Sequence, residues 1–170
     1  MNQMDFRSRC AVVTGGAAGI GLAVAKRIAA SGGRVALWDR DEYALAAART
    51  AVGAGTVTHA LDVADSAAVE SAARAAETEL GGVDVLVCSA GITGPNATTW
   101  EYPVDAWRQV FDVNVHGLFY CNRAIVPVMP RDSNWNTAVV LPLRNMSKVA
   151  ASSSGNSARS TEDSGVSKVT

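Results

Sequence analysis

The sequence predicts a doubly wound α/β fold, in which helices cover both faces of an incomplete parallel sheet of about five strands. Three observations predict it. Apolar runs of four to seven residues alternate with longer alanine-rich segments of helical period. A glycine-rich turn joins the first apolar run to the first helical segment. The 170 residues, 48% apolar and 18% charged, suit one globular domain.

The apolar runs predict strands, and the segments between them predict helices. In chain order the expected strands are Cys10–Val13, Arg34–Trp38, Thr56–Leu61, Val83–Cys88 and Thr137–Leu141. The expected helices are Gly19–Ala30, Glu42–Val52, Ser66–Leu80 and Val104–Met129. Capping signals support these boundaries. Gly32-Gly33 and Gly81-Gly82 follow two of the helices, and Asp65 directly precedes the helix that begins at Ser66.

The last expected helix carries a polar residue on an apolar stripe. Trp107, Val110, Phe111 and Asn114 are spaced i, i+3, i+4 and i+7, so they share one helix face. A buried amide requires hydrogen-bond partners, and we therefore expect Asn114 to have one.

The composition changes after about Met129. Residues 144–170 include eight serines and no aromatic residue, and they show no apolar period. This composition predicts a folded domain over residues 1–143 and a disordered serine-rich tail over residues 144–170.

Charge and cysteine usage exclude several classes of function. The net charge of −1 and the lack of a Lys/Arg run argue against nucleic-acid or membrane partners. Cys10, Cys88 and Cys121 are odd in number and widely spaced, which argues against a disulfide framework or a paired metal site. Neither histidine has a partner at metal-ligand spacing, so no metal is expected. We expect a cytoplasmic protein without a signal peptide or membrane span.

The glycine-rich turn predicts a nucleotide site. Gly15, Gly19 and Gly21 lie between a strand and a helix, where bare backbone lets a pyrophosphate approach the positive end of the helix. Asp39 ends the second strand, where its carboxylate would accept ribose hydroxyls and repel a 2′-phosphate. NAD is therefore favoured over NADP, although the Arg40 guanidinium could pair with that phosphate.

These features resemble the short-chain dehydrogenase/reductase family, whose motifs appear in the family's order over residues 8 to about 129. Thr14–Gly21 resembles the family's cofactor loop, and the resemblance also covers the segments Leu61-Asp62-Val63, Ser89-Ala90-Gly91 and Val113-Asn114-Val115. It implies a Rossmann-like domain with Asn114 as a catalytic residue. It also implies a cofactor site made of Gly15, Gly19, Ile20, Gly21, Asp39, Asp62, Val63, Ser89, Ala90 and Gly91.

The resemblance also implies an activity. Members transfer hydride between NAD(P) and a small substrate that carries a hydroxyl or carbonyl group, and intact members assemble as homo-oligomers. The chain departs from the family at Cys88-Ser89, which replaces two asparagines. We expect Cys88 to be a small buried residue rather than a reactive thiol.

The family's Tyr-x-x-x-Lys pair is absent, because the three tyrosines, Tyr43, Tyr102 and Tyr120, all lie upstream of its place. Ser164 and Lys168 have the required spacing, with Ser152 twelve residues earlier, so Lys168 and Ser152 are weak catalytic candidates. A serine hydroxyl cannot readily replace a phenol as the acid/base group.

The chain therefore resembles a family member truncated or altered after about residue 130, and a catalytically inactive NAD-binding remnant is the alternative function. A shifted reading frame between about Pro130 and Asn136 would explain the change. Translation of the coding DNA in the other two frames tests this hypothesis, and finding no Tyr-x-x-x-Lys there would contradict it.

Overall fold

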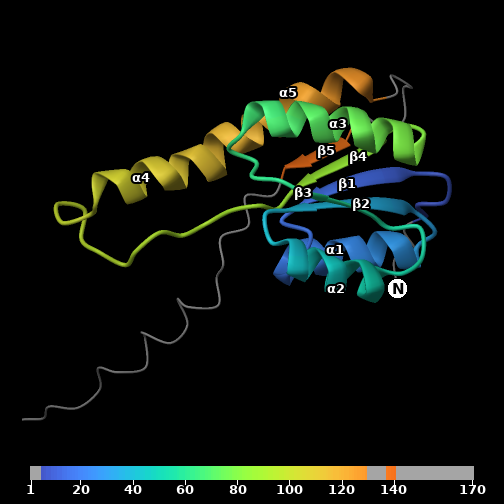
Figure 1. Ribbon diagram of the computed structural model, residues 1–170, viewed down its shortest axis with the longest axis horizontal. Coiled ribbons are helices and arrows are strands. Elements are labelled where there is room, and N and C mark those ends of the chain that lie inside the picture. Colours follow the sequence, from blue (N-terminus) through green and yellow to red (C-terminus); the bar gives the residue numbers. More distant parts are fainter. Residues whose placement is uncertain (1–4, 130–136, 141–170) are drawn as a thin grey trace, which may run out of the picture.

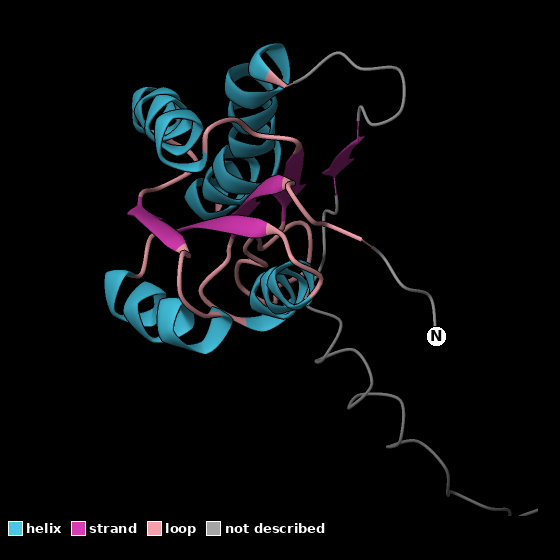
Figure 2. Ribbon diagram, turned by 90° about the vertical axis from the view of Figure 1, so that its right-hand side faces the viewer, coloured by secondary structure: helices cyan, strands magenta, loops and turns pink. Residues whose placement is uncertain are grey.

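The strands form one parallel sheet between two layers of helices (Figures 1 and 2). The computed structural model describes residues 5–129 and 137–140. In those ranges the five strands are β1 (Cys10–Thr14), β2 (Arg34–Asp39), β3 (Val57–Ala60), β4 (Val85–Cys88) and β5 (Thr137–Val140). Their order in the sheet is β3-β2-β1-β4-β5. The predicted doubly wound α/β fold is confirmed, and the strand boundaries differ from the predicted ones by one or two residues.

Two helices cover each face of the sheet. Helices α1 (Gly19–Ala30) and α2 (Glu42–Val52) lie on one face, while α3 (Ser66–Leu80) and α5 (Leu118–Ile125) lie on the other (Figure 1). The chain builds outward from β1 to β3 and then crosses back to place β4 on the other side of β1. Parallel sheets bind ligands where the strand order reverses in this way, beyond the carboxyl ends of the strands.

The alternation of side chains along the central strands separates two cores. Ala11 and Val13 of β1 face α1 and α2, whereas Cys10 and Val12 face α3 and α5. Because successive strand residues point to opposite faces, a strand covered on both sides must be apolar throughout. All five residues of β1 are accordingly buried.

Aspartate side chains cap the N-termini of α2 and α3. The cap of α3 is Asp65, as expected. Asp65 Oδ1 accepts hydrogen bonds from Ala67 N (2.9 Å) and Ala68 N (3.1 Å) at the start of α3. Helix α3 ends at Gly81, which has φ +78° in the left-handed region that a glycine adopts without strain.

The single helix predicted over Val104–Met129 is wrong. The segment contains α4 (Val104–Phe111), a π-helical stretch η1 (Asp112–Gly117), α5 and a short 3₁₀ turn η2 (Val126–Val128), and Met129 is extended. Pro127 lacks a backbone N–H and its ring crowds the preceding turn, so α5 ends at Ile125.

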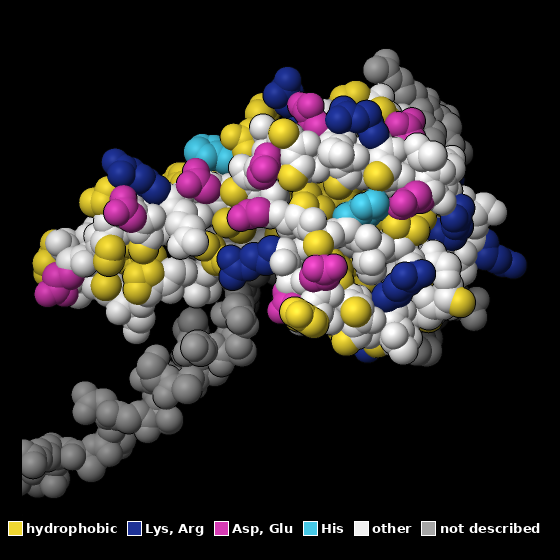
Figure 3. Space-filling view, in the orientation of Figure 1, with side chains coloured by type: hydrophobic (Ala, Val, Ile, Leu, Met, Phe, Trp, Pro, Cys, Tyr) yellow, Lys and Arg dark blue, Asp and Glu magenta, His cyan; other side chains and the backbone are white. Residues whose placement is uncertain are grey.

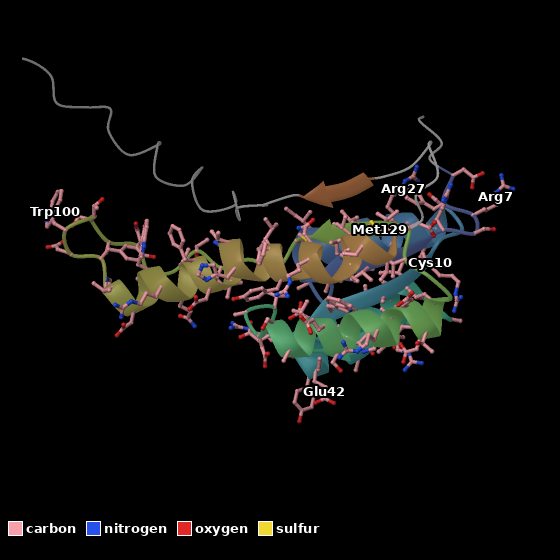
Figure 4. All side chains as sticks on the ribbon, turned by 90° about the horizontal axis from the view of Figure 1, so that it is seen from above. Arg7, Cys10, Arg27, Glu42, Trp100 and Met129 are labelled. Atoms are coloured by element: carbon pink, nitrogen blue, oxygen red, sulfur yellow. The ribbon has the colours of Figure 1, made fainter. Side chains whose placement is uncertain are left out.

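The loop before α4, α4 itself and η1 project beyond the sheet as an arm, defined here as residues 92–117 (Figures 1 and 4). Trp100 lies near its tip, at the opposite end of the molecule from Arg7 (Figure 4). No side chain of α4 is buried. In the part of the chain that the structure describes, no helix has both the length and the apolar character needed to cross a bilayer.

Candidate functional site

A cleft of about 340 Å³ opens at the carboxyl ends of the strands. It lies where the strand order reverses, and five segments that are distant in the sequence line it. The lining residues are Gly15, Ala18, Gly19, Ile20, Trp38, Asp39, Arg40, Leu61, Asp62, Val63, Ser89, Ala90, Gly91, Ile92 and Val113.

The glycine loop lines this cleft with backbone. The space around each of its glycines differs, so a side chain would be excluded at some positions and not at others. Gly15 has φ +61° and lies close to the segment that follows β4, so that a Cβ would come within 2.9 Å of Ala90 backbone atoms. A Cβ on Gly21 would overlap the Gly15 carbonyl oxygen. Gly19 has φ +53° and no atom near its would-be Cβ, so that position opens into space.

The start of α1 adjoins this loop. Its N-cap residue, Ala18, is exposed and provides no side-chain hydrogen bond to the first turn. Helix N-termini attract anions through their free N–H groups and the helix dipole, so this end of α1 suits a pyrophosphate.

Thr14 joins the glycine loop to the segment that follows β4. Its buried hydroxyl oxygen accepts hydrogen bonds from Ser89 N and Ala90 N, each at 3.1 Å. A threonine at the end of β1 thereby holds two walls of the cleft together. The sequence signal for this link is weak, because the residues lie 75 and 76 positions apart.

Asp39 lies on the cleft wall at the end of β2, as expected, with its carboxylate bonded to backbone. Oδ2 accepts from Ala17 N in the glycine loop and Oδ1 accepts from Asp41 N, both at 3.2 Å. The carboxylate therefore shapes the loop in addition to presenting negative charge to the cleft. The exposed Arg40 lines the same wall.

Asn114 has the partner that its place on an apolar stripe predicted. Its Oδ1 accepts from Ile92 N and its Nδ2 donates to Ile92 O, both at 2.9 Å. The amide thus satisfies both backbone groups of a residue that lines the cleft. Asn114 lies within the π-helical stretch, a distortion that is frequent at functional sites.

The sequence and fold comparisons agree on a family. Residues 9–141 match the model of the short chain dehydrogenase family. The chain belongs to that family. It is 55% identical over 124 residues to the 2-dehydro-3-deoxy-L-rhamnonate dehydrogenase (NAD(+)) of Sphingomonas sp. (strain SKA58), covering 73% of this chain and 49% of the relative. It is 41% identical over 128 residues to the galactitol 2-dehydrogenase (L-tagatose-forming) of Cereibacter sphaeroides, covering 71% and 50%.

Solved structures of this family share the fold. NAD+-bound xylitol dehydrogenase superposes with a TM-score of 0.72 at 31% identity, covering 74% of this chain and 49% of that one. A short chain dehydrogenase/reductase from Burkholderia phymatum in complex with NAD has a TM-score of 0.70 at 35% identity, covering 74% and 46%. This chain thus spans about half the length of the relatives that it matches.

The structure of this short-chain dehydrogenase brings together most of the predicted site residues. Nine of the ten predicted cofactor residues line the cleft, and Gly21 lies buried behind them against Gly15. The two weak catalytic candidates, Ser152 and Lys168, lie outside the described residues, as does the predicted tail over residues 144–170.

Several lining residues were not among the predicted site residues. Ala18, Trp38, Ile92 and Val113 each adjoin a predicted residue in the chain, and that adjacency was the available signal. Within residues 5–129 and 137–140, no three His, Cys, Asp or Glu side chains gather as metal ligands. His59 Nε2 lies 3.0 Å from Glu79 Oε2, and His116 Nδ1 lies 3.1 Å from Asp112 Oδ1.

Proposed function

We propose that this short-chain dehydrogenase binds NAD in the cleft and acts in hydride transfer between the nicotinamide and a hydroxyl or carbonyl group of a small molecule. One observation carries the proposal. The glycine loop, the N-terminus of α1 without a side-chain cap and the Asp39 carboxylate lie together along one side of the cleft. Bare backbone at a helix N-terminus suits a pyrophosphate, and a carboxylate at the end of the second strand suits a ribose.

Each segment of the lining has a proposed role. Gly15 and Gly19 admit the pyrophosphate to the N–H groups of α1. Asp39 accepts the ribose hydroxyls, and its charge disfavours the 2′-phosphate of NADP. Asp62 and Val63 border the adenine, while Ser89, Ala90 and Gly91 border the nicotinamide half. Bound NAD would supply the hydride acceptor, and Asn114 would hold the cleft floor through Ile92.

A polyhydroxylated substrate, such as a sugar acid or a polyol, is the proposed class. The printed names of two relatives, a 2-dehydro-3-deoxy-L-rhamnonate dehydrogenase and a galactitol 2-dehydrogenase, support this class. The loop from Ile92 to Tyr102 borders the proposed substrate side, because it leaves the sheet directly after the cleft residues at the end of β4.

We also propose a cytoplasmic homo-oligomer. Exposed apolar side chains along the arm and α5, among them Trp107 (55% exposed) and Phe119 (58%), support an assembly that covers them. The cysteines of the described residues are free thiols, as suits a reducing compartment.

A second candidate is an NAD-binding chain without turnover. The observation that favours it is the missing Tyr-x-x-x-Lys pair, because Ser164 stands four residues before Lys168 where a phenol would be needed. Turnover separates the two candidates. NAD reduction with a sugar acid or polyol supports the first, whereas cofactor binding with no reduction of any such substrate supports the second.

The test of binding is a titration of the chain with NADH and with NADPH, monitored by quenching of tryptophan fluorescence. We expect tighter binding of NADH. In Asp39→Asn the preference falls about tenfold, because a hydrogen bond to a charged group and the repulsion of a phosphate are both lost. Asparagine keeps an acceptor oxygen for the loop contact with Ala17, which alanine would remove.

Asp41→Asn is the matched control. Asp41 lies two residues further along and caps α2 through Ala44 N, and it is not among the cleft-lining residues. This variant should keep the preference for NADH. Absence of binding to either nucleotide, or equal preference in the parent chain and Asp39→Asn, would overturn the proposed NAD site.

A further inference from the structure

The outer edge of β3 presents backbone groups that no strand covers. β3 ends the sheet on one side, and within residues 5–129 and 137–140 its outer edge has no neighbouring strand. Leu61 N donates to Asp39 O at 2.9 Å, which fixes the direction in which the backbone groups of this segment alternate. The N–H and C=O groups of Thr58 and Ala60 therefore point away from β2. They are available to pair with another strand.

A hollow of about 710 Å³ lies beside this edge, between β3 and α2. Thr58 and Ala60 line it from the strand. Helix α2 lines it with a stripe at helical spacing, made of Glu42, Leu45, Ala46, Arg49 and Thr50. The stripe is negative at Glu42 and positive at Arg49, with the small Ala46 between them. In the part of the chain that the structure describes, neither charge forms an ion pair.

A second copy of the chain complements this surface by symmetry. When two β3 edges meet about a two-fold axis perpendicular to the sheet, the two α2 helices run antiparallel on the same face. Glu42 of each copy then lies opposite the partner's Arg49. Because α2 packs on both β2 and β3, the two helices would lie about 10 Å apart, an ordinary distance for packed helices.

We propose that the β3 edge and α2 form an interface with a second copy of this chain, in which the two β3 strands pair antiparallel about a two-fold axis at His59. In this register Thr58 of each copy exchanges hydrogen bonds with the partner's Ala60, so every open backbone group of the edge is satisfied. The hollow is closed by α2 packing on its counterpart, with a Glu42–Arg49 contact on either side of the axis. The interface shares no residue with the arm, residues 92–117.

Disulfide cross-linking of the full chain tests the pairing. At the axis, residue 59 faces its own counterpart in a non-hydrogen-bonded pair, with Cα atoms about 4.5 Å apart, which is within reach of a disulfide. His59→Cys should therefore give a reducible dimer on a non-reducing gel after mild oxidation. The native cysteines Cys10, Cys88 and Cys121 are buried, so the parent chain should give none.

Ala47→Cys is the matched control. Ala47 is exposed on the same helix, α2, but does not line the hollow. This variant should cross-link at least about tenfold more slowly than His59→Cys, because its two sulfurs do not meet at the axis.

Charge reversal tests the same interface without a new cysteine. Glu42→Arg and Arg49→Glu, taken singly, place like charges opposite each other and should each weaken the dimer at least about tenfold. The two reversals together restore opposite charges and should recover most of the affinity. Sedimentation velocity measures the dimer in a Trp107→Ser/Phe119→Ser background, where arm contacts do not contribute, and circular dichroism checks that each variant is folded.

Three results would overturn the proposal. The first is a His59→Cys chain that stays unlinked or links no faster than Ala47→Cys, which would leave the edge to a different occupant. The others are single reversals that dimerise as tightly as their background, and a double reversal that dimerises no better than the single ones. Neither experiment uses NADH or the arm, so failure of the proposed cofactor site or arm assembly is told apart from failure of this interface.

Discussion

The amide of Asn114 determines the position of one wall of the cleft through two hydrogen bonds to a single residue. Both backbone groups of Ile92 are satisfied by this amide at 2.9 Å, in a loop that forms no regular ladder there. A buried backbone group without a partner costs free energy, so the loop depends on this side chain.

Replacement of Asn114 tests this dependence. Asn114→Ala should lower the free energy of unfolding by about 1–3 kcal/mol, because two hydrogen bonds are lost and two part-buried groups of Ile92 are left unpaired. Urea denaturation measures the change. Asn122→Ala is the control, since its amide bonds to Leu118 O within the same helix and a smaller loss is expected. Equal losses in the two variants would contradict the role of the Ile92 contact.

Substitutions at two glycines of the cofactor loop should affect folding and NADH binding differently. Gly21→Ala should destabilise the chain strongly, because its Cβ would overlap the Gly15 carbonyl. Gly19→Ala should cost only about 1–2 kcal/mol for its left-handed φ, because nothing lies near its Cβ. The methyl group introduced by Gly19→Ala would instead occupy the cleft where the pyrophosphate is proposed to bind.

Thermal unfolding and NADH titration of both variants check this prediction. Gly19→Ala should remain folded and lose NADH affinity, whereas Gly21→Ala should lose both. A Gly19→Ala chain that binds NADH as tightly as the parent would show that the pyrophosphate lies elsewhere.

At the scale of the elements, helix ends were readable from the sequence, and an internal change of helix type was not. Asp65 caps α3 because a short acceptor at that position is a local signal that its neighbours cannot mask. The π-helical stretch has no such signal. Its last residue, Gly117, packs so closely that a Cβ would lie 2.8 Å from Val63 Cγ2, a contact with a residue far away in the chain.

The Asp65 cap has a measurable contribution. Asp65→Ala should destabilise the chain by about 1 kcal/mol, because it removes the acceptor of two N–H groups at the start of α3. Glu70→Ala, in the exposed middle of the same helix, should change stability by less than about 0.5 kcal/mol. Equal losses of unfolding free energy in Asp65→Ala and Glu70→Ala, measured by urea denaturation, would show that the cap contributes no stability.

At the scale of the whole molecule, the arm and the start of α5 expose several large apolar side chains. Yellow side chains are visible along it in the space-filling view (Figure 3). Val104, Trp107, Phe111, Val115 and Phe119 all have exposed fractions of 38% or more. A surface of this kind is typical of an interface between proteins.

Sedimentation velocity over a range of concentrations checks the proposed homo-oligomer. The parent chain should show a concentration-dependent mass, and the pair of substitutions Trp107→Ser and Phe119→Ser should shift it towards the monomer. Tyr43→Ser removes an aromatic residue that is 91% exposed on α2, away from the arm, and should leave the mass unchanged. A parent chain that stays monomeric at all concentrations would contradict the proposed assembly.

The sequence by itself determined the succession of strands and helices, the glycine loop and the place of Asp39. Each depends on residues within one or two turns or one strand, so periodicity, glycine content and spacing along the chain reveal it. Only the tertiary structure decided which of these pieces touch. Thr14 meets Ser89 across 75 positions, and Asn114 meets Ile92 across 22. Such contacts depend on strand order and on the way a helix packs on the sheet, which are properties of the folded chain that no local pattern records.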